Sequence, residues 1–217
     1  MLFRSDMRIA HFTLGDHNAA IELAVRVLKK GGVIVFPTDT IYGLGGNACD
    51  THVVEQIFKI KKRPLTKALP ILARNLQWVK ELAFVPPKLE PILEKLWPSQ
   101  TTVIMPKKDI LPHLLTAGGP TVGIRVPDST FIDGLLKAFG YPLVATSANI
   151  SGDESKATPQ KIAQDFKKEV WKPDLILDAG VLPSSLPSTI LDLSTITPRI
   201  IRTGARKAED ILSLFNL

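Results

Sequence analysis

Hydrophobic positions near the start of the chain change from a helical spacing to a strand-like run. Residues 18–30 carry apolar side chains three or four positions apart, and two lysines followed by two glycines close the segment. Ile21, Ala24 and Leu28 illustrate the spacing. This pattern predicts an amphipathic helix with glycine as its stop signal. Residues 33–36 are all apolar, mostly β-branched and bounded by glycine and proline, which predicts a short buried strand.

The same alternation of helical and strand-like segments continues along the chain. Helical patterns recur near 51–60, 75–83, 87–96, 130–139, 158–170 and 206–215. Strand-like runs lie near 69–73, 101–105, 121–126, 143–146, 175–178, 189–193 and 199–202. Helices interleaved with short apolar strands favour an α/β or mixed α+β fold. We therefore expect a twisted, open mixed sheet flanked by helices.

The distribution of prolines along the chain indicates one domain. Its 17 prolines mark the ends of segments and do not cluster into a linker, and no repeat or low-complexity tract interrupts the pattern. We expect a single domain over residues 1–217. The small and polar residues of 151–158 are the best candidate for a mobile loop.

Composition places the chain among folded proteins of the cytoplasm. Hydrophobic residues make up 45% and charged residues 22%, and no run approaches the roughly 18 apolar residues of a membrane helix. The N-terminal residues Met1–Asp6 begin no secretory signal, and the single Cys49 cannot form an intrachain disulfide. A net charge of +6 favours anionic partners such as nucleotides or RNA.

Several common chemistries are excluded by missing motifs. The four histidines have no ligand spacing, so we expect no protein-built metal site. Neither the serine-hydrolase elbow nor the P-loop pattern is present. Residues 43–48 satisfy the relaxed dinucleotide pattern Gly-x-Gly-x-x-Ala, but six residues separate them from the preceding strand. We interpret them as a tight turn.

A polar segment follows the 33–36 strand directly. Residues 37–44, Pro-Thr-Asp-Thr-Ile-Tyr-Gly-Leu, offer hydroxyls, a carboxylate and exposed backbone. Ligands gather beyond strand ends in open α/β sheets, so the segment suits a small polar substrate. Taken alone, it is better explained as a well-capped turn.

Residues 59–67 carry five positive charges and no carboxylate. Cations at a helix end complement the helix dipole, which explains the first of them. The run continues through Arg63 to Lys67, beyond the expected end of the helix, and convergent ammonium and guanidinium groups suit a polyphosphate. Both interpretations stay open.

Two later strands each contain one arginine. Arg125 interrupts the segment 121–127 and Arg202 interrupts 200–204, so strand alternation turns each guanidinium to the face opposite its apolar neighbours. Neither segment contains a carboxylate before Asp128. A bound carboxylate or phosphate is one interpretation, and a solvated sheet face is the other.

Hydroxyl and amide side chains stand at the ends of two further strands. Ser147 and Asn149 end the run that begins at 143, and Ser188 precedes the run at 189–193. Such groups can bind hydroxyl, phosphate or base edges. Each is weak evidence by itself.

Together these segments resemble the YrdC family of threonylcarbamoyl-AMP synthases. The resemblance covers about residues 18–205 and is far more specific than any one motif. Its segments, in order, are Pro37–Leu44, Lys61-x-Arg63, Thr121–Pro127, Ser147-Ala148-Asn149, and Ser188-Thr189 with Arg202-x-Gly204. The resemblance implies a twisted mixed α/β sheet with a large basic concave cleft.

The resemblance also implies an activity. Family members condense L-threonine, bicarbonate and ATP to threonylcarbamoyl-AMP with release of pyrophosphate, for threonylcarbamoyladenosine modification of tRNA. Magnesium is expected to arrive as Mg-ATP, the substrate. Longer relatives carry a further C-terminal domain, and this chain resembles the short form, which depends on partner proteins for transfer to tRNA.

Carried over by position, the resemblance implies two binding sets and two pocket-shaping residues. The L-threonine-binding set is Thr40, Arg125 and Ser188, with Arg125 facing the carboxylate. The ATP-binding set is Lys61, Arg63, Lys67, Thr121, Ser147, Asn149 and Arg202. The pocket-shaping residues are Thr38 and Tyr42. No general base is assigned, and preorganised charge would stabilise the transition state.

Two departures from the family's sequence pattern leave other functions open. Leu72 stands where some members carry a histidine, and Ser99-Gln100 stands where the family continues Gly-Pro. One alternative is a double-stranded RNA or tRNA-binding module without this activity, although an aromatic content of 6% speaks against base stacking. The other is a paralogue that uses another carbamoyl acceptor.

Overall fold

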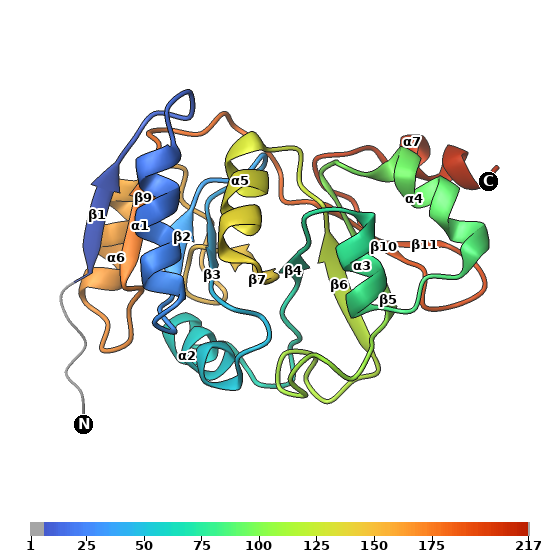
Figure 1. The fold of residues 1–217 in the computed structure, drawn as a ribbon, viewed down its shortest axis with the longest axis horizontal. Helices are drawn as coiled ribbons and strands as arrows, with labels where there is room; N and C mark the ends of the chain where they lie inside the picture. The colour runs from blue at the N-terminus through green and yellow to red at the C-terminus, as the bar shows by residue number, and fades with distance from the viewer. Residues whose placement is uncertain (1–6, 217) are drawn as a thin grey trace.

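The computed structural model describes residues 7–216 and confirms the mixed α/β class, as Figure 1 shows. The expectation based on Met1–Asp6 lies outside the described residues. The strands are β1 (Arg8–His11), β2 (Ile34–Phe36), β3 (Gly43–Gly45), β4 (Ile71–Leu72), β5 (Thr101–Pro106), β6 (Thr121–Arg125), β7 (Leu143–Val144), β8 (Thr146–Ser147), β9 (Leu175–Asp178), β10 (Thr189–Asp192) and β11 (Arg199–Arg202). The helices are α1 (Asn18–Leu28), α2 (Thr51–Lys61), α3 (Leu76–Leu82), α4 (Glu90–Leu96), α5 (Thr130–Phe139), α6 (Pro159–Lys167) and α7 (Ala208–Leu212), with 3-10 turns at Pro87–Leu89 and Ser213–Phe215.

Within the described residues the strands form two mixed sheets where one was expected. The five-stranded sheet has the order β1-β9-β2-β3-β8, and the six-stranded sheet has the order β11-β10-β5-β6-β4-β7. Each contains parallel and antiparallel pairs, such as parallel β2–β9 beside antiparallel β2–β3. Figure 1 places the two sheets in opposite halves of the molecule. None of the helices in residues 7–216 has the length and apolar character needed to cross a bilayer.

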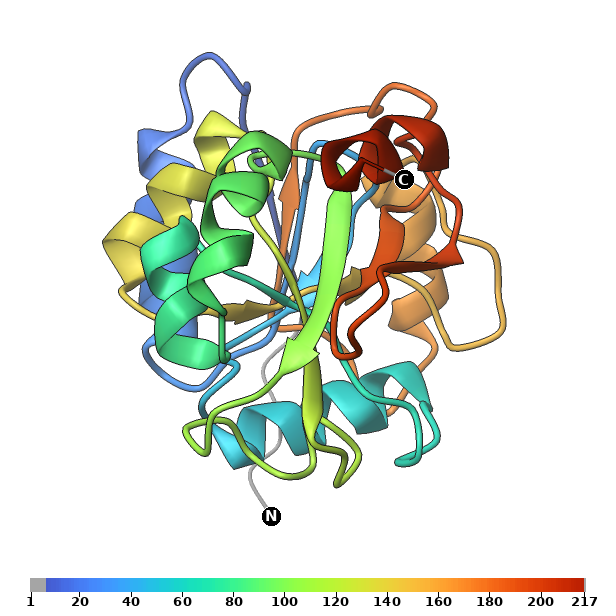
Figure 2. The same cartoon turned by 90° about the vertical axis from the view of Figure 1, so that its right-hand side faces the viewer.

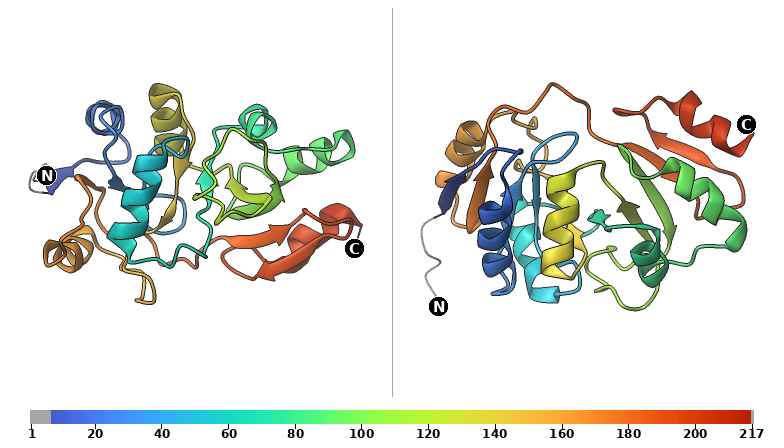
Figure 3. Two further views of the ribbon diagram at one scale, coloured as in Figure 1. Left: turned by 90° about the horizontal axis from the view of Figure 1, so that it is seen from below. Right: turned by 45° about the horizontal axis from the view of Figure 1, so that its top comes forward.

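Helices cover both faces of the five-stranded sheet, which explains why its central strand β2 is apolar throughout. Ile34 and Phe36 of β2 pack with α1 and α5, whereas Val35 points to the other face. There the apolar cluster includes Phe166 of α6. Alternate residues of a strand face opposite sides, so a strand buried on both sides reads as a continuous apolar run. Figure 3 shows α1 and α6 on opposite sides of these strands.

The six-stranded sheet packs only one face against helices. Val103 of β5 and Val122 of β6 belong to the same apolar cluster as Leu93 of α4. Figure 2 shows α3 and α4 covering this side of the strands. The alternate positions of β5, β6 and β10 face the other way, toward the five-stranded sheet, and they are more polar. This uncovered face positions the candidate site.

Every segment with a clear helical or strand-like pattern contains the expected kind of element, but the run at 143–146 divides into β7 and β8, which belong to different sheets, and two strands were missed. One is β1, and the other is β3, where the sequence indicated a tight turn. The turn prediction was wrong because Gly43–Gly45 pairs antiparallel with both β2 and β8. A Cβ at Gly45 would lie 1.6 Å from the carbonyl oxygen of Val144, so glycine here permits close approach of two backbones.

Candidate functional site

A cavity of about 360 Å³ lies on the uncovered face of the six-stranded sheet. Its floor is made of cross-strand partners. Ile190 of β10 pairs with Arg202 of β11 on one side and with Thr102 of β5 on the other. Ile104 of β5 pairs with Gly123 of β6, and this face of the two strands lines the cavity. The floor is therefore apolar at its centre and carries an arginine at its edge.

Strand β6 contributes the polar part of the floor. Thr121, Gly123 and Arg125 lie two residues apart, and all three line the cavity. The residues between them, Val122 and Ile124, belong to the apolar core. This is the period-2 pattern of a strand with one side in the core and the other facing the cavity.

The wall opposite the floor comes from the five-stranded sheet and its loops. Gly43 of β3 and Ser147 of β8 are register partners, and both line the cavity. Arg63, which follows α2, contributes a third guanidinium, and Ser155 lies at the margin. Among the described residues that line the cavity, Arg63, Arg125 and Arg202 are the charged ones, and none is acidic.

The segment after β2 folds around the hydroxyl of Thr38. This hydroxyl donates to the carbonyl oxygen of Ile41 at 2.7 Å and accepts from the amides of Thr40 and Ile41 at 3.1 and 3.2 Å. The Thr38 and Thr40 hydroxyls lie 3.0 Å apart. A hydroxyl bonded to the backbone two and three residues onward stabilises a turn. The well-capped turn and the cavity wall are thus the same structure.

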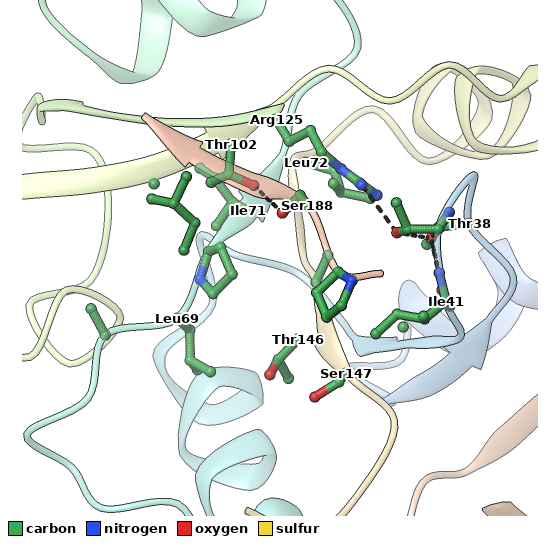
Figure 4. A pocket seen from close by; sticks show the side chains of 18 of the residues that line it. Thr38, Ile41, Leu69, Ile71, Leu72, Thr102, Arg125, Thr146, Ser147 and Ser188 are labelled. Atoms are coloured by element: carbon green, nitrogen blue, oxygen red, sulfur yellow. Dashed lines mark hydrogen bonds between the residues drawn. The ribbon is translucent and has the colours of Figure 1, made fainter. Parts of the chain in front are cut away.

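Arg125 is held from two sides. Its Nη1 donates to the Thr40 hydroxyl at 3.1 Å, and its Nη2 lies 3.1 Å from Oδ1 of Asp39. Figure 4 shows the guanidinium reaching from β6 toward the Thr38 turn. The segment around Arg125 holds no carboxylate before Asp128, and the ion-pair partner of Arg125 comes instead from the distant 37–44 segment. Burial raises the pKa of Asp39, and the charge of Arg125 acts in the opposite direction.

Tyr42 lines the cavity while its hydroxyl is anchored behind it. The hydroxyl donates to the carbonyl oxygen of Gly180 at 2.7 Å and accepts from the amide of Ala179 at 3.1 Å. Burial raises the pKa of Tyr42 to about 12, so the phenol is neutral at physiological pH. This anchor ties the cavity wall to the end of β9.

Ser188 and Arg202 meet at the other end of the floor. The hydroxyls of Ser188 and Thr102 lie 2.8 Å apart, as Figure 4 shows, and Nη2 of Arg202 donates to the carbonyl oxygen of Ser188 at 2.7 Å. Gly204 permits this arrangement, because a Cβ there would lie 2.1 Å from the carbonyl oxygen of Pro187. Both guanidinium and hydroxyl line the cavity.

Arg63 is held by the turn that follows it. Its Nε donates to the carbonyl oxygen of Lys67 at 2.9 Å and its Nη2 to that of Ala68 at 2.8 Å. Lys67 itself is exposed and does not line the cavity. Of the charged residues in 59–67, only Arg63 lines this cavity.

The cavity brings together most of the residues singled out from the sequence. Those that line it are Thr38, Thr40, Tyr42, Arg63, Thr121, Arg125, Ser147, Ser188 and Arg202. Those that do not line it are Lys61, Lys67 and Asn149. Sequence analysis missed Asp39 and Thr102 as site residues. Alternation along β5 could have identified Thr102, whereas only the tertiary structure reveals the role of Asp39.

The fold and the cavity define a mixed α/β protein whose cavity lies between two sheets and is lined in part by arginine and hydroxyl side chains. The chain belongs to the Sua5_yciO_yrdC family, described as "Telomere recombination", which it matches over residues 26–204. It is 33% identical to the threonylcarbamoyl-AMP synthase of Pyrococcus abyssi over 192 residues, 88% of this chain and 56% of the relative. The crystal structure of P. abyssi Sua5 complexed with L-threonine superposes with a TM-score of 0.87 at 31% identity, covering 97% of this chain and 61% of that chain.

A shorter relative matches over nearly its whole length. The "Uncharacterized protein YciO" of Escherichia coli is 32% identical over 194 residues, 88% of this chain and 92% of that protein. By contrast, the chain spans little more than half the length of the first two curated synthases it matches, 56% and 57%.

Proposed function

We propose that this protein is an L-threonylcarbamoyladenylate synthase. It condenses L-threonine, bicarbonate and ATP to threonylcarbamoyl-AMP, with release of pyrophosphate and water, and threonylcarbamoyl-AMP serves threonylcarbamoyladenosine modification of tRNA. The observation that carries the proposal is the convergence of Arg63, Arg125 and Arg202 on one cavity with the hydroxyls of the Thr38 turn and of Ser188. The synthase name of the P. abyssi relative and its complex with L-threonine support it.

In this proposal the amino acid binds at the Arg125 end of the cavity. A guanidinium has five N–H donors, and in this structure Arg125 directs Nη1 to Thr40 and Nη2 to Asp39. The remaining donors can bind the carboxylate of L-threonine in a charge-assisted contact. Thr40 and Ser188 offer hydroxyls to the same ligand, and Thr38 and Tyr42 shape the wall.

The nucleotide occupies the rest of the cavity. Arg63 and Arg202 supply charge for the phosphates, and Thr121 and Ser147 supply hydroxyls around the apolar centre of the floor. Attack of the carbamate on the α-phosphate builds negative charge, which preorganised guanidinium groups stabilise. Lys67 and Asn149 border this region, and magnesium enters as part of the substrate Mg-ATP.

The direct test is pyrophosphate release. Purified protein with Mg-ATP should release pyrophosphate only when both L-threonine and bicarbonate are present. Omitting either co-substrate is the matched control. Release that is independent of threonine would remove the assignment, because it would show hydrolysis of ATP alone.

A paralogue acting on another carbamoyl acceptor is the second candidate. Leu72 on the cavity lining, where some family members carry a histidine, favours it. Pyrophosphate release that requires bicarbonate and a different amine would identify this paralogue. An RNA-binding module without turnover, suggested by the net charge of +6, would instead bind tRNA with a steep salt dependence and release no pyrophosphate.

The proposed role also implies a cellular compartment and partner proteins. A synthase for tRNA modification acts in the cytoplasm and passes its product to partner proteins that transfer the threonylcarbamoyl group to tRNA. Addition of a tRNA-modification extract that lacks its own synthase should then yield modified tRNA only when this protein is supplied.

A further inference from the structure

Lys61 is a buried cation that is turned away from the cavity. It is the last residue of α2, its relative exposure is 1%, and it is absent from the cavity lining although Arg63 lies two residues later. The intervening Lys62 adopts a left-handed conformation with φ 50°, which ends the helix. Neighbouring cations of one basic run therefore point to different environments.

The ammonium group of Lys61 is bound entirely by Ser147, the last residue of β8, and by Asn149 in the loop that follows. Its Nζ donates to the carbonyl oxygen of Ser147 at 2.5 Å, to that of Asn149 at 2.8 Å and to Oδ1 of Asn149 at 3.3 Å. An ammonium has three donors, so these acceptors account for all of them. No carboxylate among residues 7–216 forms an ion pair with it.

The backbone of Lys61 adds a further tie to the same loop. Its carbonyl oxygen accepts from the amide of Ser151 at 2.8 Å. The end of α2 and the 147–151 loop are thus joined by both the side chain and the main chain of one residue. Burial, followed by the charge of Arg63, lowers the pKa of Lys61 to about 7, because both disfavour the charged form.

We propose that Lys61 is a positioning residue, which holds the 147–151 loop so that Ser147 stands at the cavity wall, and that it does not itself contact the nucleotide. The inference rests on the proposed function in one respect, because it takes the ligand near Ser147 to be a nucleotide. The geometry of the ligand-free protein carries the rest. A misplacement of a site residue by about 1 Å can cost on the order of 100-fold in activity, so such a tie has a functional effect.

The first test needs no substitution. The folded protein is treated with an amine-acylating reagent, and the labelling of Lys61 and Lys62 is followed by mass spectrometry. Lys62 is the matched control, since its side chain is 58% exposed. We expect Lys61 to react at least about tenfold more slowly than Lys62, with or without a nonhydrolysable ATP analogue. Rapid labelling that the analogue suppresses would overturn the proposal, because it would place the amine in the nucleotide site.

The second test uses Lys61→Met, with Lys62→Met as the matched control. Hydrogen exchange of the amides in 147–151 should accelerate about tenfold or more in Lys61→Met without any ligand and stay unchanged in Lys62→Met. Unchanged exchange in a folded Lys61→Met protein would overturn the proposal. If Lys61→Met does not fold, the labelling of the wild-type protein still decides between the two roles.

The third test asks whether Lys61 acts through Ser147. We expect Lys61→Met to weaken binding of the ATP analogue by about 10–100-fold. Lys61→Met combined with Ser147→Ala should bind no more weakly than Lys61→Met alone, because both changes remove one unit. Losses that multiply would indicate an independent contact and contradict the proposal. A protein that binds no nucleotide would refute the proposed function. The labelling and hydrogen-exchange results would still test whether Lys61 holds the 147–151 loop.

Discussion

The ion pair between Asp39 and Arg125 leads to a stability prediction that requires no ligand. Arg125→Ala would leave the Asp39 carboxylate, whose side chain is only 8% exposed, without its cation. Breaking a buried ion pair by removing one partner costs about 3–5 kcal/mol. We therefore expect Arg125→Ala to lower the free energy of unfolding by about that amount at pH 7.

The same variant should have a characteristic pH dependence. Burial raises the pKa of Asp39, and Arg125 opposes that effect, so removing Arg125 raises the pKa further. The folded variant then keeps a proton that the unfolded chain releases above about pH 3.9. Its free energy of unfolding falls as the pH rises from about 4 toward neutrality, because the folded state binds more protons in that window.

Urea denaturation of the wild type and three variants between about pH 4.5 and pH 7.5 would measure both effects. The variants are Arg125→Ala, Asp39→Ala and the double substitution. The double variant leaves no unpaired charge, so it should be more stable at pH 7 than additivity predicts, by about 1–3 kcal/mol. Additive losses, together with parallel pH profiles for the wild type and Arg125→Ala, would refute the reasoning.

Three further predictions concern the cavity. In calorimetric titrations, Arg125→Ala should weaken the binding of L-threonine more than that of an ATP analogue, and Arg63→Ala should do the reverse. Each lost contact should cost about 1.5–3 kcal/mol of binding free energy. Equal effects of both substitutions on both ligands would contradict the proposed division of the site. Tyr42→Phe removes a hydroxyl that makes two hydrogen bonds to the chain after β9. We expect the free energy of unfolding, measured by urea denaturation, to fall by about 1–2 kcal/mol. An unchanged midpoint would show that these hydrogen bonds contribute nothing to stability. Gly204→Ala would place a Cβ 2.1 Å from the Pro187 carbonyl oxygen. The free energy of unfolding should therefore fall by about 1–3 kcal/mol, and L-threonine binding should weaken. A wild-type stability together with a wild-type affinity for L-threonine would contradict this close approach.

The sequence predicted the elements with strong periodicity and most of the polar residues that line the cavity. Helix α5 is an example, since its apolar spacing, the Ser129 cap and Gly140 at its end all agree with one structure. The cavity face of β6 follows in the same way from Thr121 and Arg125 at alternate positions. In these cases a local pattern contains the information, because one face of the element is buried.

The remaining features depend on contacts between distant segments. The strand β3 has two glycines among its three residues, so it offers almost no side-chain pattern to recognise. The ion pair of Asp39 with Arg125 and the hydrogen bonds of Lys61 to Ser147 and Asn149 join segments that are distant in the sequence. They can be predicted only once the order of the strands is known, and no local pattern specifies that order. Charge along the chain showed that cations gather near Lys61 and Arg63, but it did not show which of them faces a ligand.

The cross-strand floor of the cavity makes ligand recognition sensitive to insertions. Because side chains alternate between faces, one extra residue at the start of β10 would send Leu191 into the cavity and Ile190 into the core, without changing any other residue. Insertions in the connection between β5 and β6 leave that alignment untouched. An insertion inside one of these strands therefore changes which side chains a ligand meets, whereas an insertion in the connection leaves them in place.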